Sequence, residues 1–310
     1  MKKIHLLFAL AAMLAIGCSK DDGDSTFDIR VPGGSILVEY THNIGEEYET
    51  RHTFSDRGTK FDKIYDGAGN VIKEFVYEGN KIVEIIATVT DGLDHYFYQY
   101  TGNSITSITV EETRNGVTTT LTEEYTYENN WITVNTPDDP PNLFKKRYTL
   151  NASGKILELD TYERTGSDSY EYSFYRYEYN NAGRIESFDI DGGLYRPSDQ
   201  AYFGDLDRSF YGGWVYFDTV LSPFKNLKDH CYQVMLFTPE IFNDGIFASG
   251  SLGLLENNLV TQYWAVNEGY NRYVEWELLR PKNILVQTNG LPYSGNVMFG
   301  FRPFEFTYTE

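Results

Sequence analysis

One short motif recurs between residues 65 and 188 of this chain and limits the folds that the chain can adopt. Its clearest copy runs from Tyr175 to Phe188, where two segments of alternating apolar and polar residues flank the loop Asn180-Asn181-Ala182-Gly183. Alternation with period two is typical of β-strands, and a short glycine-containing connection is typical of a β-hairpin. Further copies begin at Tyr65, Tyr77, Tyr100, Tyr127 and Leu150. Repeated hairpins predict an all-β fold with a curved, mostly antiparallel sheet.

The copies have two loop lengths, and each predicts its own backbone geometry. Three-residue loops suit a type I turn plus a bulge, whose last residue needs positive φ, and here that residue is Gly69, Gly154 or Gly183. Two-residue loops suit primed turns, and here they are Gly79-Asn80, Gly102-Asn103 and Asn129-Asn130. Both forms make the same two positions face each other, so we expect Tyr77 to pair with Ile82 and Tyr179 with Ile185. Asn115-Gly116 predicts one extra hairpin.

The first 18 residues have the features of a secretory signal. Lys2 and Lys3 form a basic start, and the apolar stretch Ile4 to Ile16 is too short for the roughly 20 residues that a membrane-spanning helix needs. Cys18 directly follows the small residue Gly17, which resembles the lipobox of bacterial lipoproteins, in which the cysteine is diacylated, cut free and acylated again. We therefore expect residues 1–17 to be removed and Cys18 to be the lipid anchor.

Residues 18–34 form the expected lipidated cysteine and acidic flexible tether. The run Ser19 to Asp24 (SKDDGD) resembles the export tag of Bacteroidetes-type surface lipoproteins, and it also fits a solvated, disordered linker. Residues 35–310 are expected to form a single β-rich domain, with hairpin repeats in 35–190 and an irregular, aromatic-rich capping half in 191–310.

Two copies of the motif, Tyr65 to Val71 (YDGAGNV) and Tyr179 to Ile185 (YNNAGRI), resemble the YD repeats of Rhs-type cell-surface proteins. The resemblance spans about residues 52 to 190. The whole chain also resembles an uncharacterised family of Bacteroidetes-type surface lipoproteins, which combines a lipoprotein signal, such hairpins and a later segment like Leu221 to Leu227 (LSPFKNL). This resemblance implies a cell-surface lipoprotein of the outer membrane and no particular activity.

Net charge limits the molecules that the chain can bind, and cysteine content limits the ways in which its fold can be stabilised. Removing residues 1–17 takes away Lys2 and Lys3 and no acid, so the formal net charge changes from −19 to −21. Such a chain is not expected to bind nucleic acid or anionic lipid headgroups. Once Cys18 is acylated, Cys231 is the one cysteine left, so stability must come from a hydrophobic core. The aromatic content of 16% favours sheet.

Outside the repeats, the pattern predicts a less regular structure. Residues 196–210 are expected to be loop-rich, Asp189 to Gly193 to form a loop, and Pro223 to Lys228 to form a helical turn, and no segment has the pattern of a long amphipathic helix. Strands are predicted at Ile36 to Tyr40, Glu47 to Phe54, Trp214 to Val220, His230 to Phe237, Leu259 to Val266, Arg272 to Leu279, Asn283 to Gln287 and Phe301 to Tyr308.

No motif for catalysis or metal binding emerges. A glycosidase needs two facing carboxyls, and no motif links any two of Glu256, Glu268, Glu275 and Glu277. Asp189 to Gly193 and Asp205 to Asp207 lack the remaining oxygen ligands of a calcium loop, so turn chemistry explains them better. If His230 to Phe237 is a strand, His230 and Cys231 point to opposite faces, which argues against shared zinc ligation. We expect no cofactor and no metal.

Aromatic side chains are the remaining candidates for a site. Two tyrosine stripes, Tyr96-Tyr98-Tyr100 and Tyr175-Tyr177-Tyr179, are interpreted mainly as half-buried packing. Large rings in the capping half are the proposed binding residues: Trp214, Tyr263, Trp264, Tyr270, Tyr273 and Trp276. The leading hypothesis is a binding module for a glycan, a peptide or an envelope protein. The alternatives are a carbohydrate- or peptide-processing enzyme and a purely structural envelope component.

Overall fold

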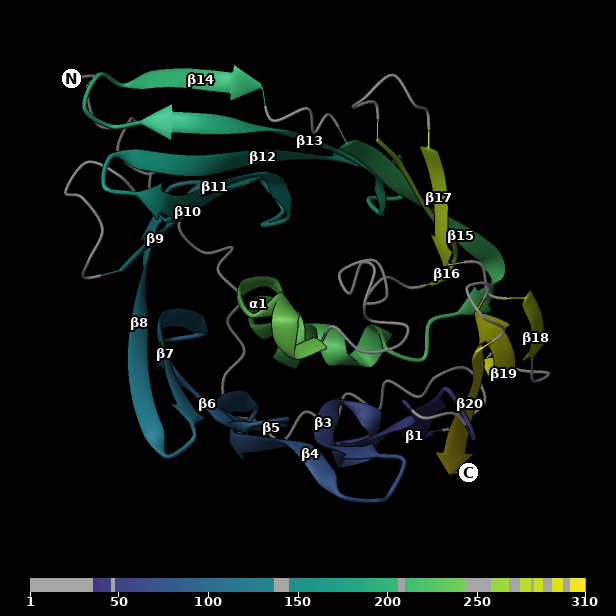
Figure 1. Ribbon diagram of the computed structural model, residues 1–310. Helices are drawn as coiled ribbons and strands as arrows, with labels where there is room; N and C mark the ends of the chain where they lie inside the picture. The colour runs from purple at the N-terminus through teal and green to yellow at the C-terminus, as the bar shows by residue number, and fades with distance from the viewer. Residues whose placement is uncertain are drawn as a thin grey trace, which may run out of the picture. The chain divides into compact units, whose positions relative to one another are not determined.

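The computed structural model describes residues 36–45, 48–136, 145–205, 210–242, 258–267, 274–279, 282–286, 292–297 and 302–309. Val31–Glu310 form one compact unit. Within the described residues, regular structure is almost entirely β-strand (Figure 1), and the strand pairings are antiparallel. The predicted all-β class with an antiparallel sheet is confirmed. No helix in these residues is long and apolar enough to cross a membrane.

The first thirteen strands follow one another with short connections. They are β1 (Ile36–His42), β2 (Thr50–Ser55), β3 (Lys60–Asp66), β4 (Val71–Glu78), β5 (Lys81–Val89), β6 (Gly92–Thr101), β7 (Ser104–Arg114), β8 (Val117–Glu128), β9 (Trp131–Asn135), β10 (Lys146–Leu150), β11 (Ile156–Gly166), β12 (Ser169–Tyr179) and β13 (Ile185–Arg196). A one-turn 3-10 helix, η1 (Asp56–Gly58), joins β2 to β3.

The later elements are less regular. They are β14 (Ala201–Asp205), β15 (Phe210–Leu221), η2 (Lys225–Leu227), α1 (Lys228–Phe237), η3 (Pro239–Phe242), β16 (Asn258–Asn267), β17 (Val274–Leu279), β18 (Lys282–Val286), β19 (Pro292–Val297) and β20 (Arg302–Thr309). The strands predicted near β15, β16, β17, β18 and β20 are present, whereas β14 and β19 were not predicted.

All these strands belong to one sheet. Neighbours in sequence are neighbours in the sheet from β1 to β13, and β13 then pairs with both β14 and β15. β16 and β17 extend the sheet from β15, while β20 pairs with β1 and β19. The repeat half and the capping half therefore share a continuous hydrogen-bonded sheet.

The hairpin geometry predicted from the turn residues is confirmed. Tyr77 pairs with Ile82 and Tyr179 with Ile185, as expected for both loop lengths. Gly183 has φ of 70°, and its N–H donates to the carbonyl of Asn180 over 2.8 Å. In the two-residue loops the first central residue has positive φ, with 61° at Gly79, 58° at Gly102 and 52° at Asn129. Asn115 and Gly116 both have positive φ, as a type I′ turn requires.

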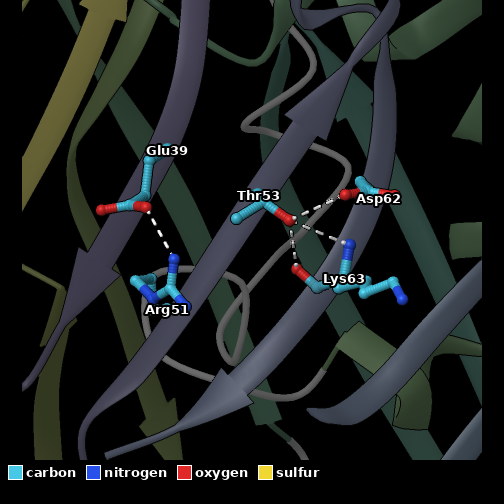
Figure 2. A network of polar contacts seen from close by, with 5 residues as sticks. All are labelled: Glu39, Arg51, Thr53, Asp62 and Lys63. Atoms are coloured by element: carbon cyan, nitrogen blue, oxygen red, sulfur yellow. Dashed lines mark hydrogen bonds and ion pairs between the residues drawn. The ribbon is translucent and has the colours of Figure 1, made fainter. Parts of the chain in front are cut away.

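The sheet carries its hydrophobic core on one face, which we call the core face. It is marked by fully or nearly fully buried side chains such as Tyr40, Phe61, Ile85, Tyr125 and Phe188. We call the opposite side the outer face. On β1 to β3 the outer face is polar (Figure 2), with Arg51 Nη1 2.9 Å from Glu39 Oε2. The Thr53 hydroxyl there donates to Asp62 and to the Lys63 carbonyl over 3.3 and 3.2 Å.

The prediction of a strand at His230 to Phe237 is wrong, because these residues lie in helix α1 (Figure 1). The buried residues Leu227, Cys231 and Val234 are three or four positions apart, which is helical spacing. One strand would bury only alternate residues, whereas a helix with its flanking turns fills the space over the core face. The inference that His230 and Cys231 point to opposite faces of a strand therefore no longer holds.

Residues 222–242, which we call the buried segment, contact many strands of the core face. The Phe224 ring lies 5.6 Å from the rings of both Tyr40 and Phe306. The Phe237 ring lies 4.4 Å from that of Tyr125, and Phe242 lies 5.4 Å from Phe61. Gln233 Oε1 accepts a 3.0 Å hydrogen bond from the N–H of Ile105. The buried segment thus supplies much of the apolar surface that the core face requires.

Candidate functional site

Four tyrosines gather on strands β11 to β14, and we call them the tyrosine cluster: Tyr162, Tyr172, Tyr195 and Tyr202. Their strand positions follow from the register, because Tyr162 pairs with Tyr172 and Tyr195 pairs with Tyr202. Tyr172 pairs with Gly193, two positions before Tyr195 on β13. Opposite and alternate residues share a face, so all four tyrosines lie on the same face of the sheet.

That face is the outer one. On β13, Phe188 and Ile190 pack in the core, so Asp189, Asp191, Gly193 and Tyr195 alternate to the other side. The tyrosine cluster is therefore separated from the core by the sheet itself. Its four rings are not part of the hydrophobic core.

The rings of the tyrosine cluster touch one another at close range. Tyr202 lies 4.8 Å from Tyr172 at an interplanar angle of 74°, and 4.9 Å from Tyr195. Tyr162 lies 5.4 Å from Tyr195, and its hydroxyl is 2.8 Å from that of Tyr202. Partial burial, and then the Tyr202 hydroxyl, raise the pKa of Tyr162. Tyr202 is nevertheless 58% exposed, so this ring presents a broad surface to solvent.

A glycine lies beneath the contact between Tyr172 and Tyr202. These residues are on β12 and β14, with β13 between them, and strands two apart are separated by roughly 10 Å. Their rings still meet at 4.8 Å, across β13, where the buried Gly193 is the register partner of Tyr172. We therefore expect a side chain at Gly193 to compete with the rings for space. Gly193 therefore forms the floor of the tyrosine cluster.

Three arginines around the tyrosine cluster are paired with aspartate. Arg176 Nε is 3.2 Å from Asp189, and its Nη2 is 2.6 Å from Asp191. Arg147 lies 2.7 Å from Asp160, and Arg196 lies 3.1 Å from Asp199. Each of these arginines has an acidic partner, so the surface near the rings carries both signs of charge in close pairs.

Two sequence expectations about this region change. Asp189 to Gly193 was predicted to be a loop, but it lies within β13, because Ile190 alternates onto the core face and anchors the strand. The carboxylates of Asp189 and Asp191 face Arg176. Within the described residues, no group of three or more His, Cys, Asp or Glu side chains is placed to hold a metal ion. Asp205 ends β14, and Asp207 lies outside the described residues.

The residues predicted as a binding site lie on neighbouring strands, as far as the structure describes them. Trp214 on β15 pairs with Tyr263 on β16, and Ala265 on β16 pairs with Trp276 on β17. Trp264 on β16 pairs with Gly213 and Glu277. Tyr270 and Tyr273 lie outside the described residues. The register thus brings four of the six residues onto three adjacent strands, and their role in binding stays a prediction.

The two tyrosine stripes are packing residues, as interpreted. Tyr96 and Tyr98 are 7% and 4% exposed, and Tyr100, Tyr177 and Tyr179 pack against the core. Sequence reasoning missed the tyrosine cluster, whose members are spread over forty positions between Tyr162 and Tyr202. The sequence does contain one signal for it. On β12, Tyr170 and Tyr172 occupy even-numbered positions and Tyr175 and Tyr177 odd-numbered ones, so the two pairs lie on opposite faces of the strand.

A second group of polar side chains lies on the core face. Glu123, 8% exposed, is 2.6 Å from Lys145 Nζ and accepts a 2.6 Å hydrogen bond from the Tyr125 hydroxyl. Burial alone would raise the pKa of Glu123, but Lys146, Lys145 and Tyr125 outweigh it and lower the pKa. Because the Glu123 carboxylate is fully engaged, we interpret this group as structural.

Comparisons with known proteins show only distant likenesses. No family model matches the chain, and no curated protein matches it. One similar solved structure is a porin-like protein from Bacteroides vulgatus ATCC 8482, with 12% identity over 89% of this chain and 99% of that chain and a TM-score of 0.40. Another is a porin-like protein from Bacteroides uniformis ATCC 8492, with 11% identity over 89% and 98% and a TM-score of 0.30.

A third similar structure is that of TcdB2-TccC3-TEV. It is 9% identical, covers 84% of this chain and 15% of that chain, and has a TM-score of 0.23. Likenesses of this size do not establish a shared function, so the function has to be argued from the residues themselves.

Proposed function

We propose that this protein is a surface-exposed lipoprotein of the outer membrane that binds an extracellular ligand on the tyrosine cluster. The lipid anchor is Cys18, at the end of the box Leu14 to Cys18, and the acidic run Ser19 to Asp24 supports export to the surface. The resemblance to YD repeats of cell-surface proteins supports the same location. The ligand is not nucleic acid, because the net charge of −19 opposes phosphate binding.

The observation that carries the binding role is the position of the tyrosine cluster. Tyrosine suits a surface with one dry and one wet side, and grouped aromatic rings outside a core are typical of interaction sites. The rings lie on the face opposite the core, and Tyr202 is 58% exposed. On β1 to β3, by contrast, the outer face carries the paired polar side chains of Glu39, Arg51, Thr53 and Asp62 (Figure 2). The rings therefore mark one part of the outer face.

This location differs in part from the one predicted from sequence. Tyr162 and Tyr172 belong to the repeat half, while Tyr195 and Tyr202 follow residue 191. The rings of Trp214, Tyr263, Trp264 and Trp276 remain a proposed second contact region, since β15 pairs directly with β13. The two regions can be tested separately because they share no residue.

The anchor is tested by mass spectrometry of the protein purified from the cell envelope. We expect the mature chain to begin at an acylated Cys18, and Cys18→Ala to release the protein from the membrane fraction or leave it unprocessed. A mature protein without lipid that begins elsewhere would refute the anchor and leave the ligand site untouched.

The binding role is tested with the full mature chain carrying Cys18→Ala, so that it is recovered without acyl chains. Binding to arrays of glycans, peptides and envelope proteins is compared between this protein and a second form with Tyr202→Ala. Tyr48→Ala is the matched control, because Tyr48 is a 70% exposed tyrosine outside the tyrosine cluster. Ligands lost with Tyr202 alone support the proposal. Turnover of a bound glycan or peptide would instead favour an enzyme, and no specific ligand would favour a structural component.

A further inference from the structure

We infer that the ligand of the tyrosine cluster is a neutral glycan, a conclusion that rests on the binding role proposed above. Three properties of the site indicate this chemical class: the ring surface, the paired hydroxyls and the local charge. Each property excludes a different class of ligand.

The ring surface favours a ligand with flat apolar faces. Tyr202 leans on Tyr172 and Tyr195, which hold its ring in place while 58% of the residue stays exposed. A ring already held by its neighbours loses little side-chain entropy on binding. A pyranose sugar offers a face of C–H groups that stacks on such a ring. Small charged metabolites lack that face.

The hydroxyl groups favour a ligand that is itself rich in hydroxyls. The hydroxyls of Tyr162 and Tyr202 are 2.8 Å apart, and either can donate to the other. Whichever hydroxyl donates, the Tyr202 oxygen keeps acceptor capacity for a ligand group beside it. Sugar hydroxyls both donate and accept hydrogen bonds, so they match this edge of the tyrosine cluster. A lipid chain offers no hydrogen-bonding group to this edge.

The charges favour a neutral ligand over an acidic one. Arg176, Arg147 and Arg196 are each paired with aspartate, and Arg164, two positions from Tyr162, donates its Nε–H to the Gly166 carbonyl over 3.0 Å. An anionic glycan would have to compete with those carboxylates, and it would approach a chain of net charge −19. A neutral glycan meets neither obstacle.

Gly193 gives the inference its sharpest structural test. The rings of Tyr172 and Tyr202 meet across β13, where this buried glycine is the register partner of Tyr172. Gly193→Val keeps both tyrosines and adds a branched side chain beneath them, so it should displace the rings without removing them. Gly166→Val is the matched glycine change, because Gly166 ends β11 and an added Cβ there would meet only the Cβ of Ser169, at an ordinary contact distance of 3.6 Å.

The experiment measures binding of the full mature chain carrying Cys18→Ala to neutral oligosaccharides, acidic oligosaccharides and peptides by calorimetry. We expect at least one neutral oligosaccharide to bind, and Tyr202→Ala and Gly193→Val to weaken that binding about tenfold or more. Tyr202→Phe should weaken it less, since the ring remains. Tyr48→Ala and Gly166→Val should leave it unchanged, and near-ultraviolet circular dichroism confirms that each variant is folded.

The outcomes separate this inference from the proposed function. Binding of peptides or acidic glycans that depends on Tyr202, with no binding of neutral glycans, would overturn the inference and leave the proposed binding role intact. Binding that is indifferent to Tyr202 and Gly193 would overturn both. Neutral-glycan binding lost only with Trp264→Ala or Trp276→Ala would place the site on β16 and β17 and would also overturn the inference.

Discussion

The hydroxyl of Tyr100 donates a hydrogen bond of 2.8 Å to the carbonyl oxygen of Ile82, in the preceding hairpin. The same bond joins Tyr127 to Ile105 over 2.9 Å and Tyr179 to Ile156 over 2.7 Å. The tyrosine that begins a copy of the motif thus connects that copy to the one before it. A phenylalanine would fill the same space but would leave the carbonyl without this donor.

Replacing Tyr100 by Phe should lower the free energy of unfolding by about 1 kcal/mol, which is typical for one lost hydrogen bond in a partly buried position. Tyr48→Phe is the control, because Tyr48 is 70% exposed. Urea unfolding followed by circular dichroism measures both. Equal stability of the two variants would show that the bond between hairpins contributes nothing.

The second prediction concerns the turn between β12 and β13. Gly183 has φ of 70°, and an added Cβ would meet no atom closer than the Lys155 ammonium at 3.7 Å, so backbone strain is the cost to expect. Gly183→Val should destabilise the protein by about 1 to 2 kcal/mol. Ala182→Ser, one position earlier, should cost far less. Thermal shifts of equal size for the two variants would contradict the assigned turn.

The hairpins could be predicted from sequence because the residues that specify them are close together. Turn residues such as Gly183 and Asn180, and the facing pair Tyr179 and Ile185, all lie within one motif. Local turn chemistry and period-two alternation then decide the register, with little contribution from distant parts of the chain.

Helix α1 could not be predicted in the same way, because two patterns fit its sequence. Tyr232, Val234 and Leu236 alternate as in a strand, whereas Leu227, Cys231 and Val234 have helical spacing. A stretch of ten residues is too short for periodicity to decide between them. Contacts with the core face decide it, and those contacts come from strands far away in sequence.

The tyrosine cluster could not be predicted from the sequence for a related reason. Tyr162 and Tyr202 are forty residues apart, and they meet because three successive strand pairings bring them together. A shift of one residue in any of these pairings would send a ring to the core face. Sequence shows that tyrosines are abundant, but the register of four strands selects which of them share a surface.

A third prediction tests the helical buried segment through its cysteine. Cys231 is fully buried, and burial raises the pKa of its thiol to about 12. In the Cys18→Ala protein, Cys231 should therefore not react with a thiol reagent at pH 8, and raising the pH to 9 should not help, because the reactive thiolate stays unpopulated. Ala152→Cys, on an exposed hairpin loop, should react at once. Rapid modification of native Cys231 would show that the buried segment is not closed against the sheet.

The last prediction uses the charge group around Glu123. The pKa of Glu123 is lowered in the folded protein, so its ionised form contributes stability above the unfolded pKa of about 4.3, and this contribution is lost as the pH falls through the folded value. Glu123→Gln should therefore be less stable than the parent at pH 7, and the difference should shrink below about pH 4. Glu124→Gln controls for the loss of one charge at an exposed neighbouring position.

Removing the two lysines instead should reverse the way in which the contribution of Glu123 to stability changes with pH. Burial is the largest influence on Glu123, and it is Lys146 and Lys145 that outweigh it. In a protein with Lys145→Met and Lys146→Met, burial should raise the pKa of Glu123 above its unfolded value, so that the variant becomes more stable relative to the parent as the pH falls from 7 towards 5. Urea unfolding at a series of pH values measures both slopes. If the double variant gained no stability relative to the parent as the pH fell from 7 towards 5, the lysines would not be what keeps this buried carboxylate charged.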